Sequence, residues 1–450
     1  MKSFFKISSC LFSNLRRFLI FTTVVYFIIN SQQIINQIYD KIQIRKIFIM
    51  QITKSERPHI AFFGCMNAGK SSLVNAVTNQ NLTVVSDVKG TTTDPVEKSM
   101  EILPLGPVVI IDTAGINDGT KEVLNNNSEL GYLRVKATMR VLDKTDIAIL
   151  VVDSAVGLQK EDKNLTKEFE TRKIPYILVW NKCDLLNSAQ KITSFKERIE
   201  IFASSKTGEG INELKEKLGH IISENKQEKY IIRDRLKQGD IIILVIPIDE
   251  SAPKGRVILP QQNVLRECLD AHAAAICCQV DELRQIIQNI APKYVITDSQ
   301  VFNVVKDIVP ENIVLTSFSI LMANYKGNLN ELVSNAKIIS ELKDGDIVLI
   351  SEGCTHHRQC NDIGTVKFPK WIKEYTGKNI KFEFTQGGEF PRDLTKYSLI
   401  IHCGGCMLNE QEMSSRIKCT KEQGIPIVNY GMAIAYMNEI LERAMEIFDE

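Results

Sequence analysis

One stretch limits the fold of this chain more than any other. The apolar run His59–Phe63 predicts a short strand, and residues 64–71 read GCMNAGKS, the P-loop pattern G-x-x-x-x-G-K-S. Residues 72–77 then have helical spacing. In a strand–loop–helix of this kind, backbone N–H groups and the helix N-terminus bind phosphates. The motif therefore predicts an α/β domain that binds a nucleotide.

The residues of this loop have separate expected roles. Lys70 should reach the β- and γ-phosphates of the nucleotide, and Ser71 should be a ligand of Mg²⁺. The other expected binding positions in the loop are Gly64, Asn67, Ala68, Gly69 and Ser72.

Two further motifs follow in the order that a GTPase requires. Residues 110–115 read IIDTAG, so Asp112 should lie near Mg²⁺ and the Gly115 N–H should face the γ-phosphate. Residues 179–184 read VWNKCD, which supplies Asn181, Lys182 and Asp184. The Asp184 carboxylate can accept two N–H bonds from guanine, and adenine cannot supply both. This residue predicts that the nucleotide is GTP.

Ser205 and Lys206, in the run Ser204–Lys206, should close over the base. Residues 90–95 read GTTTDP, and a threonine here can bind Mg²⁺ when the γ-phosphate is present. Thr92 fits best by register, with Thr91 and Thr93 as alternatives. Ile116 stands where small signalling GTPases place a glutamine that orients water. Because isoleucine cannot do so, we expect slow hydrolysis by Lys70, Thr92 and Gly115 with help from another device.

Length and composition set the outer limits. With 450 residues the chain should hold two or three domains, and a net charge of +1 gives no reason to expect a nucleic-acid partner. The 11 cysteines are too few for a disulfide scaffold. Their clustering in the last third indicates metal binding in a reducing compartment, which predicts a cytoplasmic protein.

The first 49 residues differ from the rest. An apolar run over residues 18–29 is shorter than the roughly 20 residues of a transmembrane helix. Met50 as the true start, an organelle-targeting sequence and a membrane anchor all remain open. If the stretch is a targeting sequence, the alternative location is a hydrogenosome or another organelle.

Strands and helices alternate over residues 240–315, which predicts a small α/β domain. It shows no catalytic constellation, so dimerisation is its expected role. Cys268, Cys277 and Cys278 lie in apolar runs and are expected to be buried.

The last third carries the second unusual feature. Cys354-Thr355-His356 follows one predicted strand, and His402-Cys403-Gly404-Gly405-Cys406 follows another. Ligands of parallel sheets bind beyond the carboxyl ends of the strands, so the two arms should meet at one edge. Thiolates select zinc or iron–sulfur clusters.

The Cys354-x-His356 spacing is awkward for a zinc knuckle. Three cysteines with an uncertain fourth ligand suit a 4Fe–4S cluster with one exchangeable site. We therefore expect Cys354, Cys403 and Cys406 to hold a cluster. His356 and His402 are the candidates for the fourth ligand.

Two family resemblances rest on these residues. The pattern N-A-G-K-S-S with G-T-T-T-D resembles the TrmE/Era class of GTPases, in which the asparagine matching Asn67 helps to hold a potassium ion. A purely loop-shaping role for Asn67 is the alternative. GTPase motifs followed by C-x-H…H-C-x-x-C resemble the HydF family, the maturation GTPases of diiron hydrogenases. Residues 56–60 (ERPHI), 315–319 (LTSFS) and 352–357 (EGCTHH) support the second resemblance.

The HydF resemblance implies a homodimeric scaffold that carries a 4Fe–4S cluster, whereas GTP and Mg²⁺ are expected from the motifs and stimulation by K⁺ from the TrmE/Era resemblance. It implies delivery of a diiron precursor to apo-[FeFe] hydrogenase, with two radical-SAM maturases upstream and GTP hydrolysis gating partner exchange. Two rivals are a GTPase of RNA modification or ribosome assembly and a zinc-stabilised GTPase switch. The domain plan is an extension over 1–49, a GTPase domain over 50–222, a dimerisation domain over 223–315 and a cluster domain over 316–450.

Overall fold

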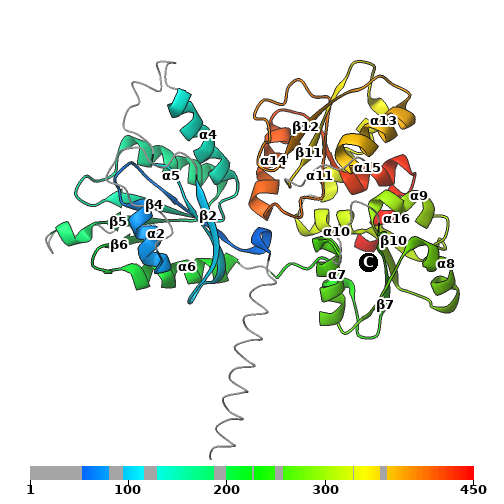
Figure 1. The fold of residues 1–450 in the computed structure, drawn as a ribbon, viewed down its shortest axis with the longest axis horizontal. Coiled ribbons are helices and arrows are strands. Elements are labelled where there is room, and N and C mark those ends of the chain that lie inside the picture. Colours follow the sequence, from blue (N-terminus) through cyan, green and yellow to red (C-terminus); the bar gives the residue numbers. More distant parts are fainter. Residues whose placement is uncertain are drawn as a thin grey trace, which may run out of the picture. The chain divides into compact units, whose positions relative to one another are not determined.

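Residues Lys54–Glu450 form one compact unit in the computed structural model (Figure 1). The structure describes residues 53–80, 95–115, 129–186, 199–225, 228–248, 257–327, 329–354 and 362–449. The extension, Thr92, Ile116 and His356 lie outside these ranges, so the predictions made for them stay predictions. Within these ranges no helix has the length and apolar character to cross a membrane.

The first domain has a six-stranded sheet in which β2 is antiparallel to β3 and the other neighbours are parallel. The strand order is β2 (Val96–Ile102), β3 (Gly106–Asp112), β1 (His59–Phe63), β4 (Ile147–Asp153), β5 (Tyr176–Asn181) and β6 (Ile199–Phe202). Strand side chains alternate between the faces. Ile60 and Phe62 therefore pack with α2 (Lys70–Thr78) and α6 (Ile211–Asn225), whereas Phe63 packs on the other face with α4 (Glu129–Asp143) and α5 (Lys160–Arg172).

The second domain has a parallel four-stranded sheet. Its order is β10 (Val314–Ser317), β9 (Tyr294–Thr297), β7 (Ile241–Val245) and β8 (Ala274–Cys278), with helices α7 (Leu259–Asp270) and α8 (Val280–Asn289) between strands. The expected boundary at residue 315 falls inside β10. Cys268 and Cys278 are buried as predicted, but the prediction for Cys277 was wrong: it is exposed, because β8 is an edge strand.

The third domain has another parallel four-stranded sheet, ordered β12 (Lys381–Gln386), β11 (Ile347–Glu352), β13 (Leu399–His402) and β14 (Ile427–Asn429). Strand β12 was not predicted, because as an edge strand it is only half-buried and carries polar residues. The predicted fold class is confirmed: a P-loop domain is followed by two smaller α/β domains with parallel sheets.

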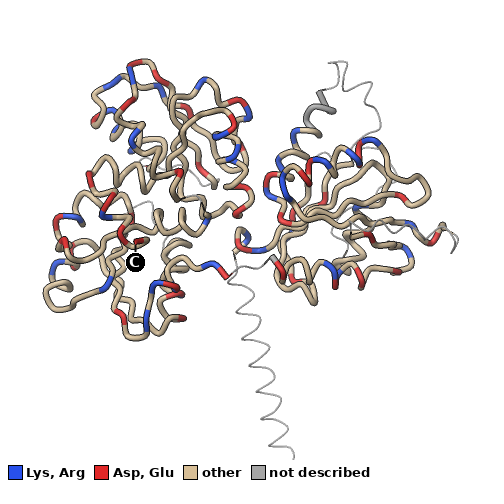
Figure 2. Tube along the Cα trace, turned by 180° about the vertical axis from the view of Figure 1, so that it is seen from behind, with Lys and Arg blue, Asp and Glu red and all other residues tan. Residues whose placement is uncertain are grey.

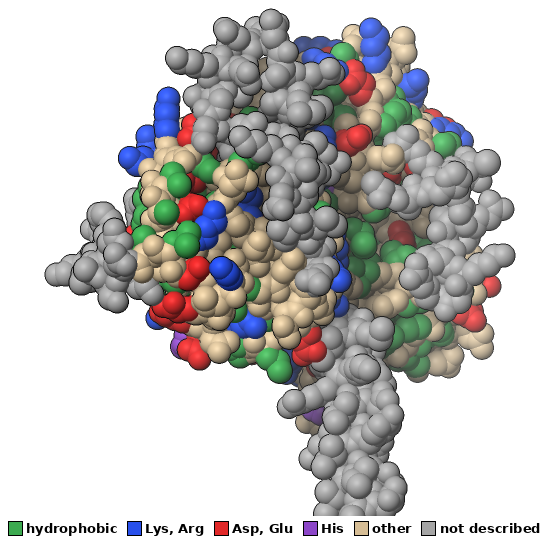
Figure 3. All heavy atoms as spheres, turned by 60° about the vertical axis from the view of Figure 1, so that its left-hand side comes forward, with side chains coloured by type: hydrophobic (Ala, Val, Ile, Leu, Met, Phe, Trp, Pro, Cys, Tyr) green, Lys and Arg blue, Asp and Glu red, His purple; other side chains and the backbone are tan. Residues whose placement is uncertain are grey.

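Charged residues of both signs are interspersed along the described chain (Figure 2). The space-filling view of one face likewise shows basic and acidic side chains mixed with apolar ones (Figure 3). This mixing agrees with the formal net charge of +1.

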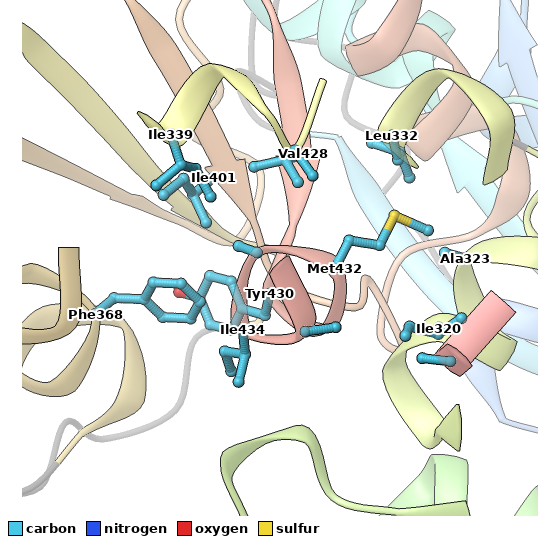
Figure 4. Close-up of a cluster of buried hydrophobic side chains, with 14 of the residues drawn as sticks. Ile320, Ala323, Leu332, Ile339, Phe368, Ile401, Val428, Tyr430, Met432 and Ile434 are labelled. Carbon is cyan, nitrogen blue, oxygen red and sulfur yellow. The ribbon is translucent and has the colours of Figure 1, made fainter. Parts of the chain in front are cut away.

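The second and third domains share one hydrophobic core. Helix α15 (Tyr430–Met437) follows β14 and contacts α10 (Phe318–Tyr325), which follows β10. Figure 4 shows Met432 and Tyr430 of α15 among side chains from both domains. Helix α16 (Leu441–Met445) then packs against β10, where Thr316 Oγ1 donates to Ala444 O over 2.9 Å.

Candidate functional site: a nucleotide site and a cysteine edge

Four loops of the first domain meet at the carboxyl edge of its sheet. They follow β1, β3, β5 and β6, which are parallel and stand in one sheet. These loops contain the P-loop, the D-T-A-G motif, the N-K-x-D motif and Ser204–Lys206. The sheet thus gathers the four motifs that the sequence placed far apart.

The P-loop takes a path that only glycine permits at two positions. Gly64 has φ +139°, and a Cβ there would lie 2.2 Å from the Val151 carbonyl oxygen. Gly69 has φ +86°, and its Cβ would lie 2.3 Å from Asn181 Nδ2. Side chains at these positions would push the loop away from β4 and from the N-K-x-D motif.

Lys70 is buried inside this loop, with 7% of its surface exposed. Its Nζ donates to Gly64 O over 3.1 Å and to Cys65 O over 2.8 Å. Burial lowers the pKa of Lys70 to about 8, although the charge of Asp112 opposes this shift. Gly115 lies beside it, since a Cβ on Gly115 would come 3.0 Å from Lys70 Nζ. The two residues expected to contact the γ-phosphate are therefore neighbours.

Ser71 and Asp112 form the expected magnesium pair. Ser71 Oγ donates to Asp112 Oδ2 over 2.6 Å. Asp112 Oδ1 is buried and has no hydrogen-bond partner among the described residues. Burial raises the pKa of Asp112, with the Ser71 hydrogen bond opposing. A buried carboxylate oxygen needs a partner, and oxygen ligands suit Mg²⁺ or its bound water. These two side chains would therefore hold the ion.

Asn181 ties the base-binding end of the site to the P-loop. It is fully buried, its Nδ2 donates to Ala68 O over 2.9 Å, and its Oδ1 accepts from Ser205 N over 3.2 Å. Lys182 Nζ donates to Asn67 O over 2.8 Å and to Asp153 Oδ2 over 2.6 Å. Asn181 and Lys182 thus act on the loop conformation, whether or not they also touch the nucleotide.

Asp184 is exposed at this end and is oriented by Ser204. The buried Ser204 Oγ donates to Asp184 Oδ1 over 2.6 Å and accepts from Lys206 N over 3.3 Å. Asp184 therefore presents an exposed carboxylate with a fixed orientation, and its contact with guanine stays a prediction. Asn67 is exposed and has φ +63°, which fits a loop-shaping role and leaves the potassium interpretation untested.

The two cysteine arms lie at one edge of the third sheet. Cys354 follows β11 and Cys403 follows β13, and these strands are parallel neighbours in which Ser351 pairs with His402. The Gly353 N–H donates to Cys403 Sγ over 3.0 Å, and the Gly405 N–H donates to the same sulfur over 3.4 Å. One arm therefore already contacts the sulfur of the other.

Burial raises the pKa of all three thiols. Burial, followed by the nearby Cys403 and Cys406, raises the pKa of Cys354 to about 12. Burial also raises the pKa of Cys403 to about 11. A bound cation removes this penalty, because thiolates are the ligands and metal binding displaces their protons.

No group of three His, Cys, Asp or Glu residues in the described ranges is arranged to hold a single metal ion. His356 and Cys360 lie outside those ranges. An iron–sulfur cluster makes a different demand on the protein, since each cysteine binds its own iron. The three cysteines fit that demand by their shared edge and by the N–H groups that reach Cys403 Sγ.

His402 is fully buried and uses both ring nitrogens. Arg416 Nη1 lies 3.0 Å from His402 Nε2, and His402 Nδ1 lies 2.7 Å from Cys403 O. Burial, followed by the charge of Arg416, lowers the pKa of His402 to about 3. The expected role of His402 as a fourth ligand conflicts with this arrangement, because neither nitrogen is left to bind metal.

Three important residues escaped the sequence analysis. In the sequence, Arg416 and Glu412 have the four-residue spacing of an exposed ion pair on a charged helix. Lys326 reads as a solvated helix end, but it is buried and its Nζ donates to Leu408 O over 2.8 Å. Asp153, which accepts from Lys182, could have been found from the sequence, because it is a carboxylate at the end of the apolar run of β4.

Four protein-family models match parts of the chain. Residues 59–182 match the 50S ribosome-binding GTPase family, and residues 134–277 match the elongation factor Tu GTP-binding domain. Residues 231–327 match the hydrogen maturase F dimerization domain, and residues 330–447 match the hydrogen maturase F tetramerization domain.

Curated relatives are similar over part of the chain. GTPase Der of Kosmotoga olearia is 35% identical over 169 residues, which cover 35% of this chain and 37% of that protein. The tRNA modification GTPase MnmE of Thermosipho melanesiensis is 36% identical over 155 residues, which cover 34% of this chain and 32% of that protein. The chain thus spans about a third of these relatives' length.

Solved structures are similar at a low overall level. Era in complex with MgGDPNP and a piece of 16S ribosomal RNA is 18% identical, has a TM-score of 0.32, and the match covers 51% of this chain and 95% of that one. The G domain of the T. maritima FeoB iron transporter is 28% identical, has a TM-score of 0.27, and the match covers 37% of this chain and 98% of that one.

Proposed function

Because this chain belongs to the HydF family of GTPases, we propose that it is a GTP-hydrolysing iron–sulfur scaffold for the maturation of [FeFe] hydrogenase. In this proposal it assembles and carries the diiron subcluster precursor, with two radical-SAM maturases as upstream partners. It then delivers the precursor to the apo-hydrogenase. We place the division between the second and third domains after α10, between the two hydrogen maturase F matches.

The observation that carries the proposal is the cysteine edge of the third domain. Cys354, Cys403 and Cys406 would hold the cluster at the carboxyl ends of β11 and β13, where bound groups of parallel sheets lie. A 4Fe–4S cluster held by three cysteines offers one iron with an exchangeable position, to which the precursor can attach. The N–H groups of Gly353 and Gly405 would stabilise the Cys403 thiolate that binds the cluster.

The nucleotide site supports GTP hydrolysis in the same chain. Lys70 and Gly115 would contact the γ-phosphate, Ser71 and Asp112 would hold Mg²⁺, and Asp184 would select guanine. Hydrolysis is slow in this proposal, because the residue after Gly115 is an isoleucine that cannot orient water. A potassium ion near Asn67 would supply positive charge to the phosphates.

Hydrogen bonds between the GTPase and cluster domains support a gating role for GTP. Ser415 Oγ on α14 (Glu410–Glu422) donates to Asp143 Oδ1 at the end of α4, over 2.9 Å. Asn409 Nδ2 donates to Lys144 O over 2.7 Å, and Ser55 Oγ donates to Cys406 O over 2.9 Å. Because α4 follows the D-T-A-G motif in the chain, a nucleotide-dependent shift of α4 would reach the cysteine arm.

Self-association is supported by the second domain. Its match is to a dimerization domain, and β8 forms one edge of its sheet. The strand reads AAICC, without a charge or a proline to discourage pairing, and Cys277 on it is exposed. We propose that a second copy covers this edge in a homodimer.

The strongest rival is a GTPase that acts on RNA, since relatives named tRNA modification GTPase MnmE resemble part of the chain. Such a protein needs a positive surface for the phosphate backbone. The net charge of +1 and the interspersed charges of Figure 2 favour the hydrogenase proposal.

A transfer experiment tests the proposed function. The protein is purified without oxygen, loaded with cluster and precursor, and mixed with apo-hydrogenase, and hydrogen evolution is measured. The wild type and a Cys419→Ser control should activate the hydrogenase, whereas Cys403→Ser should not. About four iron atoms per chain in the wild type are expected. One zinc per chain, or equal activation by Cys403→Ser, would contradict the proposal.

A further inference from the structure

Arg416 is a buried cation that joins several segments behind the cysteine edge. It lies on α14, and only 4% of its surface is exposed. Its Nη1 lies 3.0 Å from His402 Nε2, and its Nη2 donates to Gly387 O over 2.6 Å and to Glu412 Oε1 over 2.8 Å. Its guanidinium also lies over the ring of Phe390, 5.2 Å from the centroid.

The contact with Arg416 determines how His402 is protonated. A guanidinium can only donate hydrogen bonds, so His402 Nε2 must be the acceptor. The proton of the neutral ring is then on Nδ1, and it is donated to Cys403 O over 2.7 Å. A directed chain of hydrogen bonds therefore runs from Arg416 through His402 to the backbone of Cys403.

These hydrogen bonds, together with two others, hold Cys403 in place. The Cys403 N–H donates to Ser351 O over 3.0 Å, so the next strand fixes one side of the residue. Its sulfur accepts from the Gly353 N–H. Its carbonyl is left to His402, and this carbonyl begins the turn that leads to Cys406. The orientation of the turn thus depends on the ring that Arg416 holds.

The burial of Arg416 is informative in itself. On a helix surface the Glu412–Arg416 pair would contribute little to stability. Buried charges lose their hydration, and apolar residues of the same volume often stabilise a protein as well or better. An arginine at this place therefore needs a role besides packing. Its four partners indicate that the role is geometric.

We propose that Arg416 is a positioning residue for the Cys403–Cys406 turn and that His402 orients the turn without binding the cluster. The inference rests on the proposed function, in which these cysteines hold a 4Fe–4S cluster. In other metal sites, residues that hydrogen-bond to the ligands also hold them in place. Loss of such a residue weakens metal binding by about 10- to 100-fold.

The test compares Arg416→Met with Lys418→Met, a change of an exposed cation on the same helix. Each protein is loaded with iron and sulfide without oxygen and then challenged with an iron chelator. Arg416→Met should lose iron about 10-fold faster than the wild type or more, Arg416→Lys should fall between, and Lys418→Met should match the wild type. GTP hydrolysis and the circular dichroism of the metal-free proteins check that each variant has folded.

His402→Asn provides an independent test. The asparagine amide can still donate to Cys403 O, but it has no acceptor for Arg416 at the position of Nε2. The nitrogen hyperfine couplings of the reduced cluster should be the same in this variant and in the wild type. Loss of an imidazole coupling would show that His402 is a ligand and overturn the inference, as would wild-type iron retention in Arg416→Met. A wild type that binds no iron would overturn the proposed function instead.

Discussion

The Gly353 N–H donates to Cys403 Sγ over 3.0 Å, so the backbone of one cysteine arm contacts the sulfur of the other. The glycine is required here for space. A Cβ on Gly353 would lie 2.7 Å from Leu408 Cγ, and Leu408 follows the second arm. The two arms are therefore packed against each other before any metal binds.

Gly353→Ala should weaken cluster binding and destabilise the third domain by about 1–3 kcal/mol, because the added methyl group must displace Leu408. Iron content after anaerobic loading and urea denaturation measure the two effects. Gly388→Ala is the matched control, since a Cβ there would meet no atom within 4 Å. Equal iron content in the two variants would contradict the packing argument.

Cys354→Ser should abolish the cluster while GTP hydrolysis continues at the wild-type rate, because the nucleotide site is built from a different sheet. Absorbance of the cluster and phosphate release measure the two properties on one sample. Cys419→Ser should change neither, since Cys419 lies on α14 outside both arms. A fall in hydrolysis with Cys354→Ser would mean that the sites depend on each other for folding.

Asp184→Ala should weaken GTP binding by about 10- to 100-fold, since hydrogen bonds to a charged group contribute about 1.5–3 kcal/mol. Titration with a fluorescent GTP analogue measures the dissociation constant. Glu213→Ala, which removes an exposed carboxylate on α6, should leave that constant unchanged. An unchanged affinity of Asp184→Ala for the GTP analogue would contradict the prediction that Asp184 selects guanine.

Because of Glu97, the first domain should become less stable as the pH falls from 4.5 towards 2. The carboxylate is paired with Lys144 and Lys54, which outweigh the opposing effect of burial and hold its pKa at about 2, against an ordinary value of 4.5. A lowered folded-state pKa stabilises the protein fully above pH 4.5, and this contribution disappears as the pH falls towards 2.

Glu97→Gln should therefore cost about 1–2 kcal/mol at pH 7, a value reduced for solvent screening, and the difference from the wild type should vanish near pH 2. Denaturation curves between pH 2 and pH 7 measure this difference. A gap that stays constant across the range would show that the charge of Glu97 is not the cause.

The contacts of α4 with α14 and with the segment between β12 and β13 should transmit the nucleotide state. Arg392 forms an ion pair with Asp143, to which Ser415 also donates. Replacing Arg392 and Ser415 together by alanine should reduce the effect of GTP on iron loss to a chelator, by a coupling of about 0.5–2 kcal/mol. The measurement compares iron loss with GTP and with GDP. Lys418→Met, which should keep the wild-type response, is the control.

Local patterns predicted most of the architecture. The P-loop context, the strands that end in Asp112 and Asn181, and the parallel edge that gathers Cys354 and Cys403 all follow from short apolar runs and the residues after them. These features depend on neighbours in sequence or on the general geometry of parallel sheets. That is why they could be predicted without coordinates.

The remaining features depend on contacts between distant residues. The role of His402 is set by Arg416 on the following helix, whose spacing from Glu412 is also that of an exposed ion pair. The predicted domain boundary at residue 315 falls inside β10, a short strand whose following helix belongs to a core that two sheets share. The role of His402 and the extent of the second domain depend on packing between elements. The sequence pattern of a single element does not reveal that packing.

The return of α16 to the second domain has a consequence for biosynthesis. Ile447 is fully buried in the core that covers β7 and β9, next to Ile242 and Ile296. A ribosome must therefore release residues 441–448 before this sheet can close, whereas the first domain can fold much earlier.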